Sequence, residues 1–329
     1  MPVPEHHSLT DLDALHLAAR SAEIATSEGG ESLLLDGLAL LTGCHLQQGT
    51  IEVDIAAEGE AYSGIVFRAT DTLNYELAYA QPHTSEEWDS LQYDPVFHGA
   101  NTWQIYHGEA YQRQTQVPTG RWFTLRVTFQ GCRARISVDE QAPLVIERLA
   151  HGQQGGMVGV WSYLPAYFRN LRISASTAIL EEGREADQPL DASWQRVHAW
   201  FVEGLGATLC EANGALNLHR YLPASMRGIT LSRRLAVTSE TQAELAFGFS
   251  DVIDLSLDGE TIYQGRHTFS QSPEWCERGY VIPEQRLKVN LTPGEHRLSA
   301  LVQVNEPFGW GLVLALRGEG IELLPPEWS

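Results

Sequence analysis

The residues best suited to chemistry gather between Asn74 and Tyr111. Aromatic rings recur there among amides, carboxylates and histidines, at Tyr75, Tyr79, Trp88, Tyr93, Trp103, Tyr106 and Tyr111. Sugars require this mixture, because their apolar C–H faces stack on flat rings while their hydroxyls hydrogen-bond to amide, carboxylate and guanidinium groups. The segment therefore predicts a carbohydrate site. The alternative is that about half of these rings are buried, since β-sandwich strands also use aromatic residues as core.

A set of ligand-binding residues follows from the same pattern. The loop from Pro82 to Gly99 is long and carries more aromatic residues than a merely solvated loop requires. Trp310 stands between two glycines, where its indole either stacks on a sugar or packs at a domain interface. The predicted ligand-binding residues are Arg68, Tyr75, Tyr79, Gln81, Trp88, Gln92, Tyr93, His98, Trp103, Gln104 and Trp310.

Catalysis on a glycoside would need a second kind of pattern. A glycosidase uses two carboxylates about 5 to 10 Å apart, one of them with a raised pKa. We predict Glu76 as the acid/base, with Asp94 and His83 as its partners, although no paired acid motif stands on one strand. Arg68 lies on a neighbouring predicted strand and faces Glu76 either as part of a pocket or as an ordinary cross-strand ion pair.

Metal and nucleotide chemistry find little support in the sequence. A cluster of Asp94 with His83, His98 and His107 is conceivable, but the spacing of these residues matches no recognised ligand set. We therefore predict no catalytic metal. Serine-hydrolase, P-loop and dinucleotide motifs are missing, and Gly204-Leu205-Gly206-Ala207 lacks the third glycine. No cofactor is predicted. A structural calcium site is possible at Asp251, Asp254 and Asp258. The simpler interpretation is that these three acids are turn and strand-edge residues.

Charge and length limit the partners. The 329 residues carry a formal net charge of -20, which disfavours nucleic acid and anionic membranes, because binding to phosphate backbones depends on clustered lysine and arginine. A chain of this length favours two domains. The first 20 residues resemble no secretory signal, and no apolar run reaches about 18 residues, so a soluble cytoplasmic protein is expected, with export by another route left open.

The four cysteines are widely spaced and form no CxxC or CxxH pair. Reduced, partly buried thiols are the simplest interpretation. The alternative, for an exported protein, is one disulfide in each half, between Cys44 and Cys132 and between Cys210 and Cys276.

Nearly every segment follows the period-two pattern of strands separated by Gly, Asn, Asp or Pro turns. We therefore predict an all-β protein of two antiparallel β-sandwich, jelly-roll domains. The predicted division is an N-terminal extension at 1–21 with weak helical character over Leu9–Arg20, a sandwich at 22–175, a charged linker at 176–193 and a second sandwich at 194–329.

Several motifs in the first half occur in a recognisable order. They are Gly49-Thr50-Ile51-Glu52-Val53-Asp54-Ile55, Ser63-Gly64-Ile65-Val66-Phe67-Arg68, Asn74-Tyr75-Glu76-Leu77, Gln92-Tyr93-Asp94-Pro95, Gly120-Arg121-Trp122-Phe123 and Ala166-Tyr167-Phe168-Arg169-Asn170-Leu171. This order resembles the concanavalin A-like lectin and glucanase superfamily, in its laminin-G-like and 3-keto-disaccharide hydrolase-type branch. The resemblance implies two sheets packed face to face, with ligand on the concave face or its rim. The run Tyr75-Glu76-Leu77-Ala78-Tyr79 departs from the longer polar run expected of an active hydrolase of that type.

The second half resembles the galactose-binding-like jelly-roll modules that accompany many glycosidases. The motifs that carry this resemblance are Glu211-Ala212-Asn213-Gly214-Ala215-Leu216-Asn217-Leu218, Phe247-Gly248-Phe249-Ser250-Asp251, Leu257-Asp258-Gly259-Glu260, Leu291-Thr292-Pro293-Gly294-Glu295-His296 and Phe308-Gly309-Trp310-Gly311-Leu312.

Three functions follow, in order of support. The first is recognition of a carbohydrate or glycoside by two sandwich modules, with the ligand on the concave face of the N-terminal domain. The second is a glycoside hydrolase or lyase in which Glu76 acts as acid/base. The third is a structural or protein-interaction scaffold. The sequence does not specify the sugar, its linkage or the oligomeric state.

Overall fold

The computed structural model describes residues 4–27, 30–175, 190–270 and 277–326. It divides into a first unit of residues 1–99 and 106–186 and a second unit of residues 100–105 and 187–329. Within the described ranges the regular structure is antiparallel β-strand, broken only by single turns of 3-10 helix at η1 (Leu12–Ala14), η2 (Pro82–Thr84) and η3 (Leu218–Arg220). The predicted all-β class with antiparallel β-sandwiches is confirmed. None of these elements is a helix of the length and apolarity that crossing a membrane requires.

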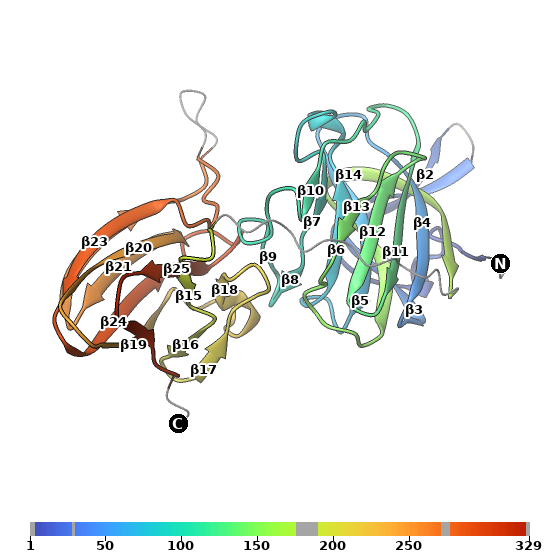
Figure 1. Cartoon of the computed structure of the whole chain (residues 1–329). Helices are drawn as coiled ribbons and strands as arrows, with labels where there is room; N and C mark the ends of the chain where they lie inside the picture. The colour runs from blue at the N-terminus through green and yellow to red at the C-terminus, as the bar shows by residue number, and fades with distance from the viewer. Residues whose placement is uncertain (1–3, 28–29, 176–189, 271–276, 327–329) are drawn as a thin grey trace. The chain divides into compact units, whose positions relative to one another are not determined.

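The first unit is built around a large antiparallel sheet whose main path runs β10-β7-β6-β5-β14-β4-β11-β12-β13 (Figure 1). Its strands are β1 (Glu5–His7), β2 (Leu15–Ser27), β3 (Gly30–Leu46), β4 (Gly49–Ala56), β5 (Tyr62–Ala69), β6 (Glu76–Ala80), β7 (Leu91–Tyr93), β10 (Gln112–Arg113), β11 (Phe123–Gln130), β12 (Arg133–Val138), β13 (Leu144–Ile146) and β14 (Gly156–Ser174). The short strand β8 (Val96–Phe97) lies outside this sheet.

The strand β11 shows why these residues form strands. Phe123, Leu125, Val127 and Phe129 are buried, and the residues between them are partly exposed and polar. Because successive side chains of a strand point to opposite faces, this alternation gives one core face and one solvent face. The polar face holds an ion pair of 2.6 Å between Arg126 and Glu52 of β4.

The strand β14 connects the two layers of the first unit. Its first half pairs with β5 and its second half with β4, while β3 runs beside both halves. The pairing shifts register between Ser162 and Ala166, and Leu164 has a φ of +68°. Such a bulge bends a strand, so one continuous segment pairs with β5 before the bend and with β4 after it.

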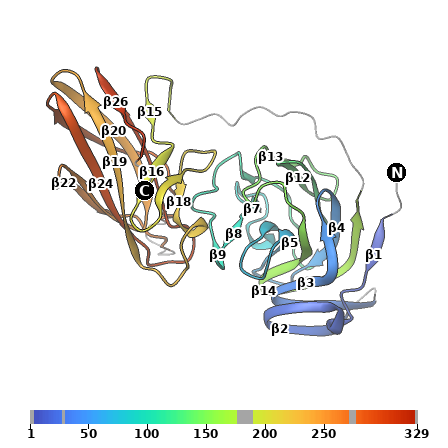
Figure 2. The ribbon, with the colours of Figure 1, turned by 90° about the horizontal axis from the view of Figure 1, so that it is seen from below.

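The N-terminal segment differs from the prediction. Weak helical character was expected over Leu9–Arg20, but β2 pairs with β3 from Leu15↔Leu41 to Ser27↔Gly30, and β1 pairs with β14 (Figure 2). A short helix without a packing partner is marginal, whereas the long edge of β3 offers the backbone a complete set of hydrogen bonds. The predicted extension is therefore part of the first unit's sheet.

The second unit is a sandwich of two sheets. One has the order β15-β25-β20-β23, with β18 beside β25, and the other has the order β17-β16-β19-β24-β21-β22, with β26 beside β19. The strands are β15 (Gln195–Arg196), β16 (Ala199–Val202), β17 (Gly206–Leu209), β18 (Leu216–Asn217), β19 (Gly228–Val237), β20 (Thr241–Ser250), β21 (Val252–Leu257), β22 (Glu260–Arg266), β23 (Gln285–Leu291), β24 (Gly294–Gln303), β25 (Gly311–Arg317) and β26 (Ile321–Leu323); β9 (Ala100–Asn101) also belongs to this unit.

The core of the second unit lies between these sheets and includes Trp200, Phe247, Leu231 and Trp310. Of the predicted linker, residues 176–189 lie outside the described residues, and residues 190–193 lead into β15.

The cysteines follow the simpler interpretation where they can be seen. Cys44, Cys132 and Cys210 are free thiols, so the alternative Cys44–Cys132 disulfide is not formed. Cys276, the other half of the second alternative pair, lies outside the described residues.

One ion pair of the second unit makes its stability depend on pH. His296 Nδ1 lies 2.6 Å from Asp258 Oδ2, and its Nε2 lies 2.8 Å from the Thr292 carbonyl oxygen. Because both ring nitrogens face acceptors, the doubly protonated imidazolium is favoured: the Thr292 carbonyl and then Asp258 raise the pKa of His296. Burial opposes the shift at Asp258, yet the Arg297 N–H and His296 lower the pKa of that carboxyl.

We predict that this pair contributes stability between about pH 4 and pH 6.5, the ordinary pKa values of the two groups. A raised histidine pKa stabilises the fold below the unfolded pKa, and this contribution disappears as the pH rises through the folded pKa. From pH 6 to pH 9 the free energy of unfolding of the second unit should fall by up to about 1 kcal/mol more in the wild type than in His296→Gln. Urea denaturation of the full chain at both pH values measures this, with the exposed His16→Gln as control. Equal pH dependence in wild type and His296→Gln would contradict the prediction.

Candidate functional site

One face of the first unit gathers aromatic side chains from three neighbouring strands and a turn. Register pairs Gly64 of β5 with Tyr79 of β6 on one side and with Trp161 of β14 on the other, and it also pairs Tyr62 with Tyr163. Residues two apart on a strand share a face, so these side chains project from the same side of the sheet. We call the resulting group the aromatic platform: Tyr62, Tyr79, His83, Trp161 and Tyr163.

The rings of the platform touch one another in a continuous group. Tyr62 is at its centre, with ring centroids 6.0 Å from Tyr79, 4.8 Å from His83 and 5.8 Å from Tyr163. Trp161 lies 5.7 Å from Tyr79. These spacings and the tilted or edge-on angles are those that aromatic pairs prefer, so each ring helps to hold the next in place.

The members of the platform differ in how far their side chains are exposed to solvent. The Tyr163 side chain is 48% exposed, and Tyr79 is 5% exposed at the base of the group. His83 is exposed on η2, while Tyr62 and Trp161 are half-buried. A set of rings that is supported from below and open above is a preorganised stacking surface.

Gly64 explains how the rings come so close. A Cβ atom at this position would lie 2.0 Å from the Ala78 carbonyl oxygen and 2.7 Å from the Tyr79 Cβ. Only glycine fits between the two neighbouring strands at this point, and its missing side chain leaves room between Tyr79 and Trp161.

Two charged residues border the platform. The Arg20 guanidinium carbon lies 5.0 Å from the Tyr163 ring centroid, and Arg20 Nε donates to Asp36 Oδ2 at 2.8 Å. The Leu164 N–H also donates to Asp36, at 3.1 Å. This arrangement fixes the Tyr163 ring from one side by a cation–π contact.

Glu76, the predicted acid/base, is fully buried. Its Oε2 accepts a hydrogen bond of 2.6 Å from the Tyr93 hydroxyl, and its Oε1 accepts one of 2.8 Å from the His151 N–H. Burial first, and then the Glu76 carboxylate, raise the pKa of Tyr93 well above its usual value, so the phenol remains protonated and donates. Glu76 is thus held in the interior of the unit.

The predicted catalytic partners do not join Glu76. The Asp94 N–H donates to the Leu77 carbonyl, and Tyr93 pairs beside Ala78, so strand alternation puts Asp94 on the sheet face opposite to Glu76. His83 contacts Tyr62 of the platform, which projects from the face that Tyr79 shares. Asp94 is buried, and its charge adds to burial in raising the pKa of Tyr75.

Arg68 does not form the cross-strand ion pair with Glu76 that was one of its two predicted roles. Its guanidinium donates to the carbonyl oxygens of Gln47 at 3.1 Å, of Gly131 at 2.7 Å and of Gly152. Burial lowers the pKa of Arg68, and the nearby Glu76 carboxylate opposes that shift. The arginine therefore ties three loops together from inside the unit.

The other predicted ligand residues of the first unit are either buried or at least partly exposed to solvent. Tyr75, Gln81 and Gln92 are buried, and the Gln81 side chain donates to the Asp89 carbonyl at 2.6 Å. Trp88 is 45% exposed on its loop. The half-buried His98 has a φ of +50°, and its N–H donates to the Asn74 side chain.

Trp103, Gln104 and Trp310 belong to the second unit. Trp310 is fully buried in the core there and donates to the Val302 carbonyl at 3.2 Å. Trp310 is thus a core residue of the second unit, whereas sequence analysis offered sugar stacking or packing at a domain interface.

Cation ligands do not gather in the part of the chain that the structure describes, where no three His, Cys, Asp or Glu side chains form a group that could hold a metal. Asp251 accepts the N–H groups of Asn305 and Glu306, and Asp254 accepts a hydrogen bond from Gln264. With Asp258 bound to His296, each of the three acids considered for calcium has a local partner.

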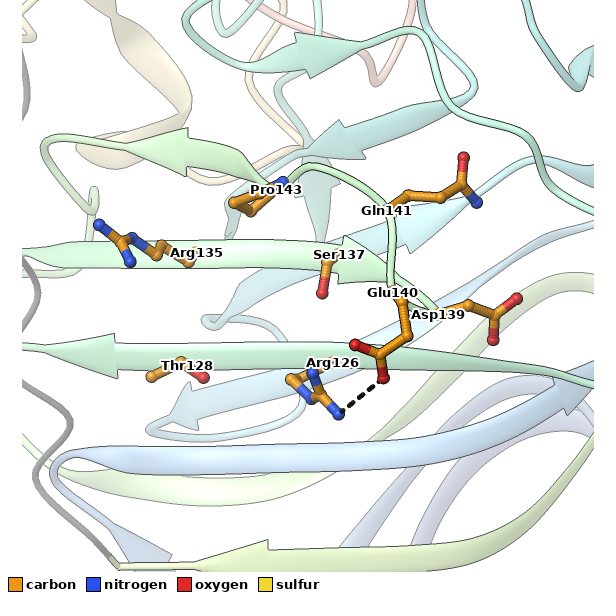
Figure 3. Close-up of a pocket in the computed structure, with 8 residues that line it drawn as sticks. All are labelled: Arg126, Thr128, Arg135, Ser137, Asp139, Glu140, Gln141 and Pro143. Carbon is orange, nitrogen blue, oxygen red and sulfur yellow. Dashed lines mark ion pairs between the residues drawn. The ribbon is translucent and has the colours of Figure 1, made fainter.

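An open hollow of about 220 Å³ lies over the solvent face of β11 and β12, as Figure 3 shows. Arg126 and Arg135 line it together with Thr128, Ser137 and Glu140. The Arg126 charge is already matched by Glu52 at 2.6 Å and Glu140 at 4.0 Å. The hollow is therefore lined almost entirely by polar and charged residues, unlike the mostly apolar pockets that bind small molecules.

Sequence analysis missed three members of the platform. Tyr62 on β5 and Trp161 and Tyr163 on β14 lie outside the aromatic-rich segment. The signal was present as two short patterns, Tyr62-Ser63-Gly64 and Trp161-Ser162-Tyr163, in which the i and i+2 residues share one strand face.

We predict that the Tyr93–Glu76 contact is a stability element. Tyr93→Phe removes a hydrogen bond to a buried carboxylate and should lower the free energy of unfolding of the first unit by about 2–3 kcal/mol. Urea denaturation of the full chain measures this. Tyr163→Phe, which alters an exposed hydroxyl, should change stability by less than about 0.5 kcal/mol. Equal free energies of unfolding for Tyr93→Phe and Tyr163→Phe would show that the Tyr93–Glu76 hydrogen bond does not stabilise the unit.

Comparison with known proteins gives similarity to solved structures only, since no family model and no curated protein matches. A carbohydrate-binding module of Bacillus subtilis is 18% identical, covers 48% of this chain and 94% of its own, and has a TM-score of 0.38. A β-glucanase of Bacillus licheniformis is 11% identical, with coverage of 53% and 99% and a TM-score of 0.37. Domains LG4-5 of the mouse laminin α1 chain are 12% identical, with coverage of 89% and 89% and a TM-score of 0.29. Identities and TM-scores of this size do not assign a ligand to the chain.

Proposed function

We propose that the first unit binds a carbohydrate on the aromatic platform and does not cleave it. The observation that carries the proposal is the group of contacting rings on the shared face of β5, β6 and β14, with Tyr163 48% exposed at its edge. Flat rings open on one side offer the apolar surface on which the C–H face of a pyranose or furanose stacks.

Polar groups at the border supply the other half of sugar recognition. His83 is exposed beside Tyr62, and the side chains of Arg20 and Asp36 lie next to Tyr163. A few oriented polar groups around an apolar surface fix the orientation of a hydroxyl-rich ligand. The formal net charge of -20 favours a neutral or basic sugar over a sulfated or phosphorylated one.

Binding is better supported than catalysis because of where the acids lie. Glycoside hydrolysis requires two carboxyl groups on either side of one bond. Glu76 is fully buried and bonded to Tyr93 and His151, on the sheet face opposite to the platform. A sugar on the platform therefore has no path to Glu76 in this conformation.

The names of two similar structures, a carbohydrate-binding module and a β-glucanase, agree with a sugar ligand. The proposal does not depend on them. It depends on the platform, and removing the platform rings tests it.

We predict that Trp161→Ala and Tyr163→Ala each weaken binding of a glycan by about tenfold, which corresponds to about 1.4 kcal/mol. A glycan array screened with the full chain identifies the sugar, and isothermal titration measures the affinity of each variant. Trp122→Ala is the matched control, because Trp122 is half-buried on the same unit but packs under Arg169 at 3.8 Å, away from the platform.

The outcomes separate the three functions. Loss of binding in the platform variants alone supports the proposal, provided that the recovered sugar is intact by mass spectrometry. A shortened or altered sugar that appears with the wild type and not with Glu76→Gln would establish the enzyme instead. If no sugar binds the wild type, the carbohydrate-binding proposal is wrong, and the structural or protein-interaction scaffold is the remaining function.

A further inference from the structure

The segment Trp103-Gln104-Ile105 is held in the second unit in the manner of a bound peptide. It is separated in sequence from the rest of that unit by residues 106–186, which belong to the first unit. Gln104 and Ile105 are fully buried, and Trp103 is half-buried. A short segment this far in sequence from the rest of its unit is buried there only if specific contacts hold it.

Gln104 is bound at both its main chain and its side chain. Its N–H donates to the Phe308 carbonyl at 3.2 Å, and its own carbonyl accepts from the Val281 N–H at 2.9 Å. Its side-chain Nε2 donates to the Arg278 carbonyl at 3.1 Å, and its Oε1 accepts from the Ser250 hydroxyl at 2.8 Å. Main-chain pairing combined with a pocket for one side chain is how proteins recognise extended peptides.

Trp103 lies against three aromatic rings. Its ring centroid is 5.5 Å from Phe269, 5.8 Å from Tyr280 and 5.5 Å from Phe308. Two of these contacts are edge-on, at 83° and 90°. The three rings form a cage that matches an indole in size and geometry.

Glycines make the space that Gln104 and Ile105 occupy. A Cβ at Gly309 would lie 2.8 Å from Gln104 Cβ, and one at Gly279 would lie 2.5 Å from Gln104 Nε2. A Cβ at Gly311 would lie 3.0 Å from the Ile105 side chain. The Asn213 side chain closes the end of this space by donating to the Ile105 carbonyl at 2.8 Å.

We propose that the second unit contains a peptide-binding slot for an aromatic–amide–aliphatic sequence, and that Trp103-Gln104-Ile105 fill it as a tethered ligand. The slot consists of the Phe269, Tyr280 and Phe308 cage, the Ser250 and Arg278 hydrogen-bonding groups, and the three glycines. Tethering supplies the segment at a high effective concentration, so the slot opens to another peptide only when the segment leaves.

The first experiment empties the slot and refills it. In the full chain, Trp103→Ala with Gln104→Ala removes both anchoring side chains. A fluorescent peptide with the sequence of residues 101–106 should bind this double variant at least tenfold more tightly than the wild type, whose own segment competes. Adding Gly309→Ala to the double variant should abolish peptide binding, whereas adding Gly294→Ala should not.

Gly294 is the matched control for Gly309. Both glycines belong to the second unit and have similar φ values, +137° and +151°, so alanine strains both backbones alike. A Cβ at Gly294 meets no atom within 4 Å, whereas one at Gly309 meets Gln104. A difference between the two variants therefore reports on the slot.

A second measurement covers the case in which the double variant fails to fold. In an otherwise wild-type chain, Gly309→Ala should lower the Tm of the second unit by roughly 5 °C more than Gly294→Ala, because it forces Gln104 outward. Equal Tm values for the two variants would overturn the slot. A folded double variant that binds the peptide no better than the wild type would overturn the tethered-ligand role.

Discussion

The bend in β14 is the constraint on which the first unit depends. At the bulge around Leu164 the strand leaves its pairing with β5 and takes up pairing with β4. Before the bend, Trp161 and Tyr163 lie on one face while Val158 and Val160 are buried on the other. After it, Phe168 and Leu171 enter the core. One strand thereby supplies core residues on both sides of the bend and places two rings of the platform.

Strand alternation then decides which chemistry the unit can perform. Glu76 and Tyr79 lie three positions apart on β6, an odd number, so their side chains must point to opposite faces. The acid is consequently held by Tyr93 inside the unit, whereas the ring joins Tyr62 and Trp161 outside. Moving the register by one residue would exchange them, and the Glu76 carboxylate would then lose its hydrogen bonds to the Tyr93 hydroxyl and the His151 N–H.

The fold was predictable because it depends on period and turns, which are local properties. The alternation of β11 and the Asp258-Gly259 turn can be read directly, and the antiparallel sandwiches follow from many such strands. The N-terminal hairpin was missed because Leu15–Ser27 becomes a strand through pairing with β3, a contact that intrinsic propensity does not encode. The bend of β14 is equally invisible, since nothing in Tyr163-Leu164-Pro165-Ala166 alone specifies a change of partner.

The site was harder to predict for a related reason. Aromatic density drew attention to residues 74–111, but the structure distributes those rings among three environments. Tyr93, Tyr106 and Tyr111 contact one another with ring centroids 5.1–6.1 Å apart, Tyr79 supports the platform, and Trp103 enters the cage of the second unit. Composition identifies which residues can stack on a ligand, whereas the partners of each ring decide whether it does.

The same segment therefore contributes to the core of the first unit, to the proposed carbohydrate platform and to the proposed slot of the second unit within less than forty residues of chain. Its aromatic residues suit all three roles because a ring buries a large apolar area at a low cost in side-chain entropy. What distinguishes the roles is the support beneath each ring. Tyr163, which lies on β14 outside the segment, has neighbours on one side and solvent on the other, whereas Trp103 has rings on several sides. An aromatic ring that is packed on one side only, such as Tyr163, can stack on a ligand. A ring enclosed by other rings, such as Trp103, instead fills the proposed slot itself.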